Sequence, residues 1–432
     1  MTILLNRDQF NARAEILAAR EAGVFHLLTG YAGSGKTTLT QDLAAYWERA
    51  GVEVVLTAPT HKAVSVLARK LRLNGLETPC ITIHSLLSLT PKPHGDRLVF
   101  ERKKKADPVR SDVVVIDECS MISADLMRHI RRHLPVSFVL FVGDPAQLPP
   151  IGEELSETFG TKRKSHLSSI VRQAAENPIL NAADIIRNSQ GNPMDWSWMK
   201  SAKAPPLGVY NPRDPDEWMR KAFTSSDFAQ DPDTFRYLCW TNEQVHRVNQ
   251  RVRRWIYGET DAPFVPNEAA LFRSPVFAED GKTPLISTNE EATVMDIERG
   301  MFSHLIPPRA ELAGWKAQVP VWKIKVMKED GQIVKVETPR DVKAYNAVLA
   351  RIADEAGETR DRWGDHHSFK QRLASVQNVY AMTVHTSQGS TFRNVFTDVA
   401  DIRRRASSNV LETQQLLYVA VTRPTDALVL VQ

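Results

Sequence analysis

One stretch of the sequence, Gly30-Tyr31-Ala32-Gly33-Ser34-Gly35-Lys36-Thr37, has the residue types and spacing of a triphosphate-binding loop. Its glycines let the backbone N–H groups close around phosphates, where a Cβ atom would intrude. The Lys36 ammonium can lie between the β- and γ-phosphates, and the Thr37 hydroxyl can bind Mg²⁺. The stretch therefore predicts a nucleoside triphosphate site.

Two acids, Asp117 and Glu118, come directly after the apolar run Val113–Ile116. At the end of a buried strand, Asp117 can hold Mg²⁺ through water, and Glu118 can orient or deprotonate an attacking water. Such a pattern by itself is also common at solvated strand edges. Downstream of a phosphate-binding loop it favours triphosphate hydrolysis, because a kinase would need an acceptor-binding apparatus instead.

Three further polar side chains could act on a γ-phosphate. Gln147 lies in the segment Gly143–Pro150 after another apolar run, although the same segment could be a loop that its prolines end. Arg172 and Arg423 could reach the phosphate across a cleft between domains, which would make hydrolysis depend on domain closure. A lone arginine is usually a solvated or ion-paired surface residue, so both readings stay open.

These residues need a scaffold of strands and helices, and the hydrophobic pattern supplies one. An apolar run over 24–29 precedes the phosphate-binding loop, and a helical pattern from Lys36 to Ala50 follows it with Leu39, Leu43 and Trp47 on one face. Other short apolar runs suit strands buried on both faces of a parallel sheet. Their alternation with helical patterns predicts an α/β fold. The runs are Val54–Leu56, Val113–Ile116, Phe138–Val142, Tyr237–Trp240, Val395–Phe396 and Ala427–Val431, and the helical patterns include His61–Leu71, Ala124–Leu134 and Pro178–Asn188.

The α/β pattern breaks in two places. Between residues 72 and 106, turn residues and the short apolar run Leu98–Phe100 indicate a small β-rich insertion with a hairpin. Between residues 257 and 369, Trp322, Ile324 and Val326 alternate with lysines before the turn Asp330-Gly331. A small barrel-like module followed by a helix over Asp341 to Ala356 is expected there.

Bulk composition bounds the class of protein. The 432 residues exceed one ordinary core, so two to four domains are expected. A net charge of +4 permits nucleic-acid binding without requiring it. The three scattered cysteines, Cys80, Cys119 and Cys239, argue against a disulfide framework or zinc site. Without a signal-peptide pattern or a membrane-length apolar run, a soluble cytoplasmic protein is expected.

Nine short motifs occur along nearly the whole chain in an order that resembles superfamily 1 helicases of the 5′→3′ (1B) branch, in particular the Dda-like and RecD-like enzymes. Each motif alone is weak, but nine in this order are highly specific. They are GYAGSGKTT (30–38), TAPTHKA (57–63), TIHSLL (82–87), IDECSM (116–121), GDPAQLPP (143–150), VRQ (171–173), WTNEQV (240–245), VHTSQGST (384–391) and LLYVAVTR (416–423).

The resemblance implies a definite architecture. We expect two RecA-like P-loop domains, each a parallel sheet flanked by helices, with two small β-rich insertions, a hairpin pin and an SH3-like barrel with a helix. The expected boundaries are 1–71 and 107–172 for the first RecA-like domain, 72–106 for the pin insertion, 173–256 and 370–432 for the second RecA-like domain, and 257–369 for the barrel insertion.

The resemblance also assigns residues to the ATP site. Gln9 would read the adenine, while Gly389 and its neighbour Gln388 would relay nucleotide state to a bound strand. Mg²⁺ would bind Thr37 and Asp117. The expected ATP-binding residues are Gln9, Gly30, Gly33, Ser34, Gly35, Lys36, Thr37, Thr38 and Gly389, and the expected catalytic residues are Lys36, Glu118, Gln147, Arg172 and Arg423.

The family further implies single-stranded DNA lying across both RecA-like domains. Polar side chains suit phosphate contacts that read no base sequence. His84 and His385 could instead be core histidines, and Phe100, the expected wedge aromatic, could be hairpin core. His366-His367 departs from the family pattern near Trp363, and 305–318 matches poorly. The expected contacts are Pro59, Thr60, His61, His84, Ser85, Phe100, Thr241, Asn242, Trp363, His385 and Thr386.

The resemblance therefore implies an ATP-dependent 5′→3′ DNA translocase and helicase that separates strands at the hairpin. An RNA helicase of the same superfamily, or an ATP-gated single-strand clamp with little unwinding, remains an alternative. Implied partners are single-stranded DNA, its junctions with duplex, and single-strand-binding or replication proteins. The expected setting is replication, repair or recombination, as a monomer in the cytoplasm of a bacterial cell or phage-infected host.

Overall fold

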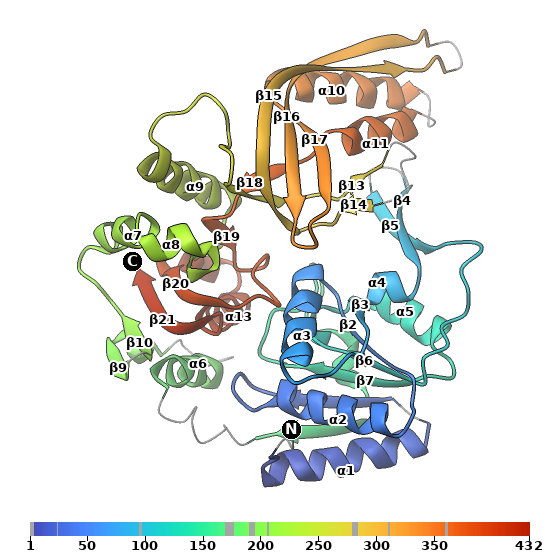
Figure 1. Cartoon of the computed structure of the whole chain (residues 1–432), viewed down its shortest axis with the longest axis vertical. Coiled ribbons are helices and arrows are strands. Elements are labelled where there is room, and N and C mark those ends of the chain that lie inside the picture. Colours follow the sequence, from blue (N-terminus) through green and yellow to red (C-terminus); the bar gives the residue numbers. More distant parts are fainter. Residues whose placement is uncertain are drawn as a thin grey trace. The chain divides into compact units, whose positions relative to one another are not determined.

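Buried parallel strands form the centre of the first RecA-like lobe in the computed structural model of the chain (Figure 1). The strand order is β3-β2-β6-β7-β1-β8, and every neighbouring pair is parallel. The predicted strand Val113–Ile116 is β6 itself. The elements are α1 (Arg7–Glu21), β1 (His26–Gly30), α2 (Lys36–Arg49), β2 (Val54–Ala58), α3 (His61–Leu73), β3 (Cys80–Thr82), α4 (Ile83–Leu86), β6 (Val113–Ile116), η1 (Cys119–Met121), α5 (Ala124–His133), β7 (Phe138–Gly143), η2 (Glu157–Gly160) and β8 (Arg163–Leu167).

A second sheet forms the second lobe, in the order β19-β11-β20-β21-β10-β9. Its pairs are parallel except the edge pair β9–β10. The elements are α6 (Pro178–Asn188), η4 (Ser197–Met199), β9 (Ala202–Ala204), β10 (Leu207–Tyr210), α7 (Pro215–Phe223), α8 (Ser226–Gln230), η5 (Pro232–Thr234), β11 (Phe235–Cys239), α9 (Asn242–Tyr257), β19 (Ala381–Thr383), β20 (Phe392–Asp398), α12 (Val399–Arg403), η6 (Arg404–Ser407), α13 (Val410–Val421) and β21 (Pro424–Val431).

The two sheets repeat one topology. In chain order, β1, β2, β3, β6 and β7 of the first sheet take the same relative places as β10, β11, β19, β20 and β21 of the second. Both sets are parallel, so the carboxyl ends of corresponding strands face corresponding edges. The predicted α/β class with two such lobes is confirmed.

Apolar side chains on the helices hold the layers together. The predicted face of α2 is buried: Leu39, Leu43 and Trp47 all have 0 % exposure and belong to the core that packs on the first sheet. Burying a side chain of this size contributes about 1.5–3 kcal/mol. Helix starts are capped by side chains, for example by Thr60 on α3 and Thr241 on α9, whose hydroxyl oxygens accept from backbone N–H groups three residues on.

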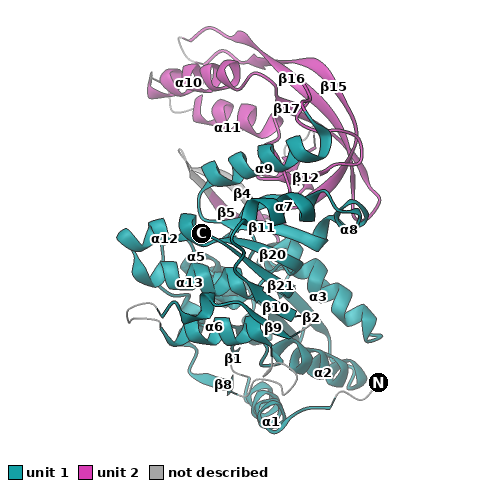
Figure 2. Cartoon of the chain, turned by 90° about the vertical axis from the view of Figure 1, so that its left-hand side faces the viewer, with its two compact units in different colours: residues 1–87, 107–258, 380–432 teal, residues 88–106, 259–379 magenta. Residues whose placement is uncertain are grey.

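The remaining elements form a separate compact unit of residues 88–106 and 259–379 (Figure 2). Its main sheet is antiparallel, in the order β17-β16-β15-β12-β18. The predicted turn is present, because Gly331 has φ of +82° and its N–H donates to the Lys328 carbonyl. The elements are β4 (Leu89–His94), β5 (Arg97–Arg102), β12 (Ala269–Phe272), β13 (Val276–Phe277), β14 (Pro284–Ile286), β15 (Glu291–Ile306), β16 (Trp315–Lys328), β17 (Ile333–Pro339), α10 (Val342–Glu358), α11 (Arg362–Arg372) and β18 (Val376–Asn378).

The borders of this unit differ from those expected from the sequence, because strand pairing decides them. β3 pairs with β2, which keeps residues 80–82 in the first lobe, and the first unit runs to residue 87. β18 pairs with β12, which keeps residues 376–378 in the second unit. Pairings between distant segments leave no local signal in the sequence.

The structure describes residues 4–23, 25–94, 97–168, 177–189, 195–204, 207–278, 284–309, 312–358 and 362–432. Arg172 lies outside these residues. Within them, no helix is both long enough and apolar enough to cross a membrane.

Candidate functional site

The predicted phosphate-binding loop connects β1 to α2 with the backbone of a ligand cradle. Gly33 and Gly35 have φ of +79° and +83°, a left-handed conformation that residues with a Cβ rarely adopt. Gly35 is also the N-cap of α2 and supplies no side-chain capping bond. The N–H groups of the first turn of α2 can therefore bind an anion.

Lys36 and Ser34 fit a phosphate within this loop. The Lys36 ammonium donates to the carbonyls of Gly30 and Tyr31, at 2.6 and 3.1 Å, which holds its charge at the loop. The buried hydroxyl of Ser34 has no hydrogen-bond partner among the described residues. A Cβ atom at Gly30 would come within 2.5 Å of that hydroxyl oxygen, so the site excludes a larger residue there.

Asp117 and Glu118 follow β6 at the same edge of the sheet as the loop. The Asp117 carboxylate accepts from the Glu118 N–H at 2.9 Å, and Glu118 has φ of +52°. A left-handed glutamate is an uncommon conformation that often marks a functional position. Burial raises the pKa of both carboxyl groups, and the charge of Lys36 opposes that rise.

Asp117 and Thr37 also fit the Mg²⁺ predicted for this site. They offer a carboxylate and a hydroxyl oxygen, and Mg²⁺ is usually bound by one or two carboxylates together with substrate phosphates. Because burial raises the pKa of Asp117, a cation bound there would favour its charged form.

Arg423 brings a charge from the second lobe to these acids. It is 5 % exposed, and its guanidinium donates to the carbonyls of Val419 and Ser390, both at 3.1 Å. Burial lowers the pKa of Arg423, and the nearby Glu118 carboxylate opposes that shift. In turn, the Arg423 charge opposes the rise in the pKa of Glu118 that burial causes.

The other predicted ATP-site residues are placed as follows. Gln147 accepts from the Ser120 hydroxyl at 3.4 Å, just beyond the acid pair. Gln9 is buried, and its amide donates to the Gly35 carbonyl at 3.1 Å while its amide oxygen accepts from the Asn6 N–H. Gln9 therefore ties α1 to the phosphate-binding loop.

Tyr418 and Asp144, which had no predicted role, connect the two lobes at the loop. The Tyr418 hydroxyl donates to the Asp144 carboxylate at 2.6 Å and accepts from the Ala32 N–H at 3.1 Å. Asp144 lies in the same motif as Gln147, and Tyr418 in the same motif as Arg423. A tyrosine within the apolar α13 was the available signal, since a buried hydroxyl needs a partner.

The structure brings together predicted nucleic-acid contacts from two motifs of the first lobe. His61 begins α3, and His84 on α4 lies near enough that the His61 charge affects its pKa. Burial is the largest cause that lowers the pKa of His84 to about 4, with smaller effects from His61 and His129. His84 is therefore neutral at physiological pH. Pro59 immediately precedes the Thr60 cap, and Ser85 is exposed on α4.

Gly389 joins this group from the second lobe. Its φ is +74°, and a Cβ atom there would lie 2.7 Å from the Cβ of Ala63 and 3.4 Å from the Thr60 hydroxyl oxygen. The adjacent Gln388 amide donates to the Leu148 carbonyl at 3.3 Å. The segment predicted to relay nucleotide state thus touches the first lobe at the start of α3 and after β7.

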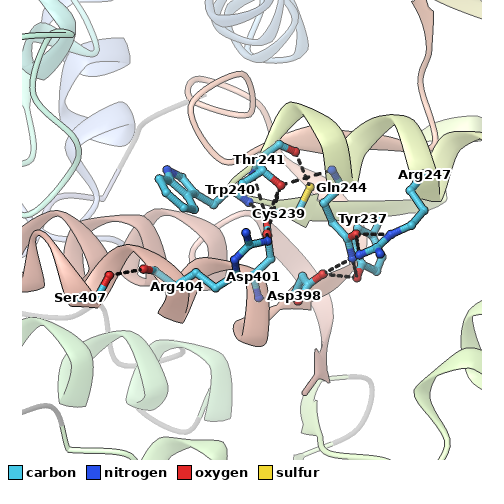
Figure 3. Close-up of polar contacts among 10 residues, drawn as sticks. All are labelled: Tyr237, Cys239, Trp240, Thr241, Gln244, Arg247, Asp398, Asp401, Arg404 and Ser407. Carbon is cyan, nitrogen blue, oxygen red and sulfur yellow. Dashed lines mark hydrogen bonds and ion pairs between the residues drawn. The ribbon is translucent and has the colours of Figure 1, made fainter.

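A second group surrounds Thr241 in the second lobe (Figure 3). The buried Asp401 carboxylate accepts from the Trp240 and Thr241 N–H groups, at 2.9 and 2.8 Å, and from the Thr241 hydroxyl. Because that hydroxyl also accepts from the Gln244 N–H, both its donor and an acceptor position are used internally. Asn242, the exposed first residue of α9, is better placed than Thr241 to contact a phosphate.

His385 lines a separate cavity of about 580 Å³ within the first unit. The segment Leu148–Glu154 forms one wall, and Arg405 and Glu412 lie on the other. Burial lowers the pKa of His385. Its neighbour Thr386 bonds to the Thr383 hydroxyl at 2.9 Å.

The two predicted aromatic contacts lie in the second unit. Phe100 is 39 % exposed on β5, which pairs with β4 to form the hairpin. Trp363 is half-buried on α11, and its ring lies edge-on to the His366 ring with 5.4 Å between the ring centres. His366 therefore packs on Trp363 at the position where the sequence departs from the family.

Comparison with known families matches both lobes. Residues 4–201 match an AAA domain, and residues 378–431 match a UvrD-like helicase C-terminal domain. The ATP-dependent DNA helicase Dda of enterobacteria phage T4 is 27 % identical over 97 % of this chain and 97 % of its own length. These matches are consistent with the superfamily 1B helicases.

Other similarities agree with this family. The ATP-dependent RecD2 DNA helicase of Deinococcus radiodurans is 37 % identical over 36 % of this chain and 21 % of its own length. A crystal structure of Bacteroides Pif1 bound to single-stranded DNA has a TM-score of 0.51 and 16 % identity, covering 99 % of this chain and 92 % of that one. The Pif1 likeness shows that this chain has a Pif1-like helicase fold.

The low pKa of His84 gives a testable pH dependence of stability. An unfolded histidine has a pKa near 6.5, whereas that of His84 in the folded chain is about 4. Between these values the unfolded chain binds a proton that the folded chain does not, so stability should fall as pH drops from about 6.5 towards 4. Melting curves at pH values between about 6.5 and 4 should show that His84→Gln loses less stability on acidification than wild type does. The exposed His246→Gln is the control, and equal falls in both variants would contradict the prediction.

Proposed function

We propose that this chain is an ATP-dependent helicase that moves 5′→3′ along single-stranded DNA. We propose further that it separates duplex by excluding one strand at the β4–β5 hairpin. The proposal rests first on one observation, the meeting of the phosphate-binding loop, the acid pair Asp117-Glu118 and Arg423 at one edge of the first sheet.

This arrangement suits hydrolysis that depends on both lobes. Lys36 would hold the β- and γ-phosphates, Glu118 would take the proton of the attacking water, and Gln147 would orient the terminal phosphate. Mg²⁺, held by Thr37 and Asp117, would supply charge neutralisation on the phosphates. Arg423, with Arg172 as a further candidate, would stabilise charge in the transition state, as an arginine finger does.

Coupling to DNA would use the contacts between the lobes. Gly389 and Gln388 of the second lobe touch the first lobe near Thr60 and Leu148, so a change at the ATP site can shift them relative to the first-lobe DNA contacts. Alternating grip by the two lobes would then move a strand stepwise. The polar groups on both lobes suit contacts with phosphate rather than bases, which supports movement without sequence preference.

The proposal includes the domain roles. The two lobes of the first unit, residues 1–87, 107–258 and 380–432, would act as the RecA-like pair. The second unit, residues 88–106 and 259–379, would guide the strands. Single-stranded DNA and its junctions would be the substrate, with single-strand-binding or replication proteins as partners and a monomer as the working form. A cytoplasmic location stays a prediction.

Replacing the loop lysine tests the ATP site. Lys36→Ala should lower ATP hydrolysis by at least about a hundredfold, because a preorganised charge on the phosphates is lost. Hydrolysis should be measured with and without single-stranded DNA, and wild type should be strongly stimulated by it. Lys221→Ala, an exposed lysine on α7, is the control. Normal ATP hydrolysis by Lys36→Ala would refute the assignment of the phosphate-binding loop. If single-stranded DNA does not stimulate hydrolysis by wild type, the proposed translocase activity is wrong.

Tailed duplexes test direction and substrate. Duplex with a single 5′ tail should be opened in the presence of ATP, and duplex with a single 3′ tail should not. Opening only from the 3′ tail would overturn the proposed polarity. Stimulation of hydrolysis by RNA oligomers equal to that by matched DNA would favour the RNA alternative, and stimulation without opening of either duplex would favour a clamp.

Truncating Phe100 tests the hairpin. Phe100→Ala should keep DNA-stimulated hydrolysis but lose most unwinding, since an exposed aromatic that stacks on a base is worth about 1–3 kcal/mol. Val99→Ala is a matched control, because successive side chains of a strand point to opposite faces and Val99 is similarly exposed. If Phe100→Ala unwinds duplex as well as Val99→Ala does, Phe100 does not act as a wedge.

A further inference from the structure

The Tyr418 hydroxyl joins three elements from two lobes. Tyr418 is 1 % exposed on α13 of the second lobe. Its two partners, the Ala32 N–H and the Asp144 carboxylate, belong to the phosphate-binding loop and to the segment after β7 in the first lobe. A backbone N–H of the very loop that would bind the triphosphate therefore ends on a side chain of the opposite lobe.

The helix that carries Tyr418, α13, is hydrogen-bonded to α6, and α6 makes a second contact with the same loop. The Gln414 amide on α13 donates to the Ser189 carbonyl at the end of α6, at 2.6 Å. On α6, Arg187 forms an ion pair with Asp184 and places its guanidinium 3.7 Å from the centre of the Tyr31 ring. The α6–α13 pair thus touches two adjacent loop residues, Tyr31 and Ala32.

The same helix leads to the arginine of the ATP site. α13 ends at Val421, and Arg423 follows two residues later with its guanidinium bonded back to the Val419 carbonyl. A displacement of Tyr418 along or across the helix axis would therefore carry Arg423 with it. Packed helices move as rigid elements, which gives a physical route from the loop to the arginine.

We propose that Tyr418 is a positioning residue that couples the phosphate-binding loop to Arg423 through its hydroxyl. The inference rests on the proposed ATP hydrolysis at this loop. When the loop rearranges around phosphates, the position of the Ala32 N–H changes. The Tyr418 hydroxyl, which accepts from that N–H, transmits the displacement to α13. Asp144 keeps the hydroxyl oriented as a donor and is itself fixed by the Ala146 N–H at 2.9 Å.

A purely structural role for Tyr418 makes a different prediction. As a satisfied core tyrosine it would affect stability but not the ratio of DNA-stimulated to basal hydrolysis. Tyr237 provides the matched case, since its buried hydroxyl donates to the Asp398 carboxylate at 2.6 Å, with both residues inside the second lobe. Tyr237→Phe therefore removes the same kind of bond without a contact to the loop.

The test compares Tyr418→Phe with Tyr237→Phe in the full chain. Tyr418→Phe should lower the DNA-stimulated kcat by about tenfold, as expected for losing a hydrogen bond to a charged group, with a smaller change in the KM for ATP. Tyr237→Phe should keep the stimulation of wild type. Equal behaviour of the two variants, or full stimulation in Tyr418→Phe, would overturn the inference.

A second measurement separates this inference from the proposed function. Hydrogen exchange of the α13 amides, with and without a non-hydrolysable ATP analogue, needs no turnover. Wild type should show altered exchange in α13 on binding, and Tyr418→Phe should lose most of that response. Analogue binding to wild type with no response in α13 would overturn the coupling alone. No analogue binding at all would refute the ATP site and the coupling with it.

Discussion

The structure depends on charges that are buried together at one edge of the first sheet. Two carboxylates, Asp117 and Glu118, leave water there, and Lys36 and Arg423 offset part of the cost. Burying an unpaired charge costs several kcal/mol, so the nearby Arg423 guanidinium favours the charged form of the Glu118 carboxyl group. The charged groups at this edge therefore come from both lobes.

Local patterns made much of this predictable. The phosphate-binding loop, the acid pair, and strands such as β6 and β7 follow from glycine spacing and short apolar runs, which act within a few residues. The contact between Tyr418 and Asp144 spans 274 residues and leaves no such pattern. The unit borders differ from the expected ones because no apolar run marks β3 or β18, which pair with β2 and β12.

The predicted DNA contacts divide by how their polar groups are used. Thr241 bonds to Asp401 and to the Gln244 N–H, so it shapes the start of α9. Thr60 caps α3, and a hydroxyl that accepts from the backbone can still donate to a phosphate. The motifs mark these segments as candidates, and the hydrogen bonds then show which side chains hold a segment in place.

The two sheets share one strand order but differ at corresponding edges. In the second lobe, the connection from β10 to α7, residues 211–214, takes the place of the phosphate-binding loop, and it contains no glycine. Asp398, at the end of β20, stands where Asp117 stands, and it accepts bonds from Tyr237 and Gln244. The corresponding edges therefore differ: the first carries the acid pair and the predicted phosphate-binding loop, and the second is braced internally by the bonds of Asp398 while its lobe brings Arg423 near Glu118.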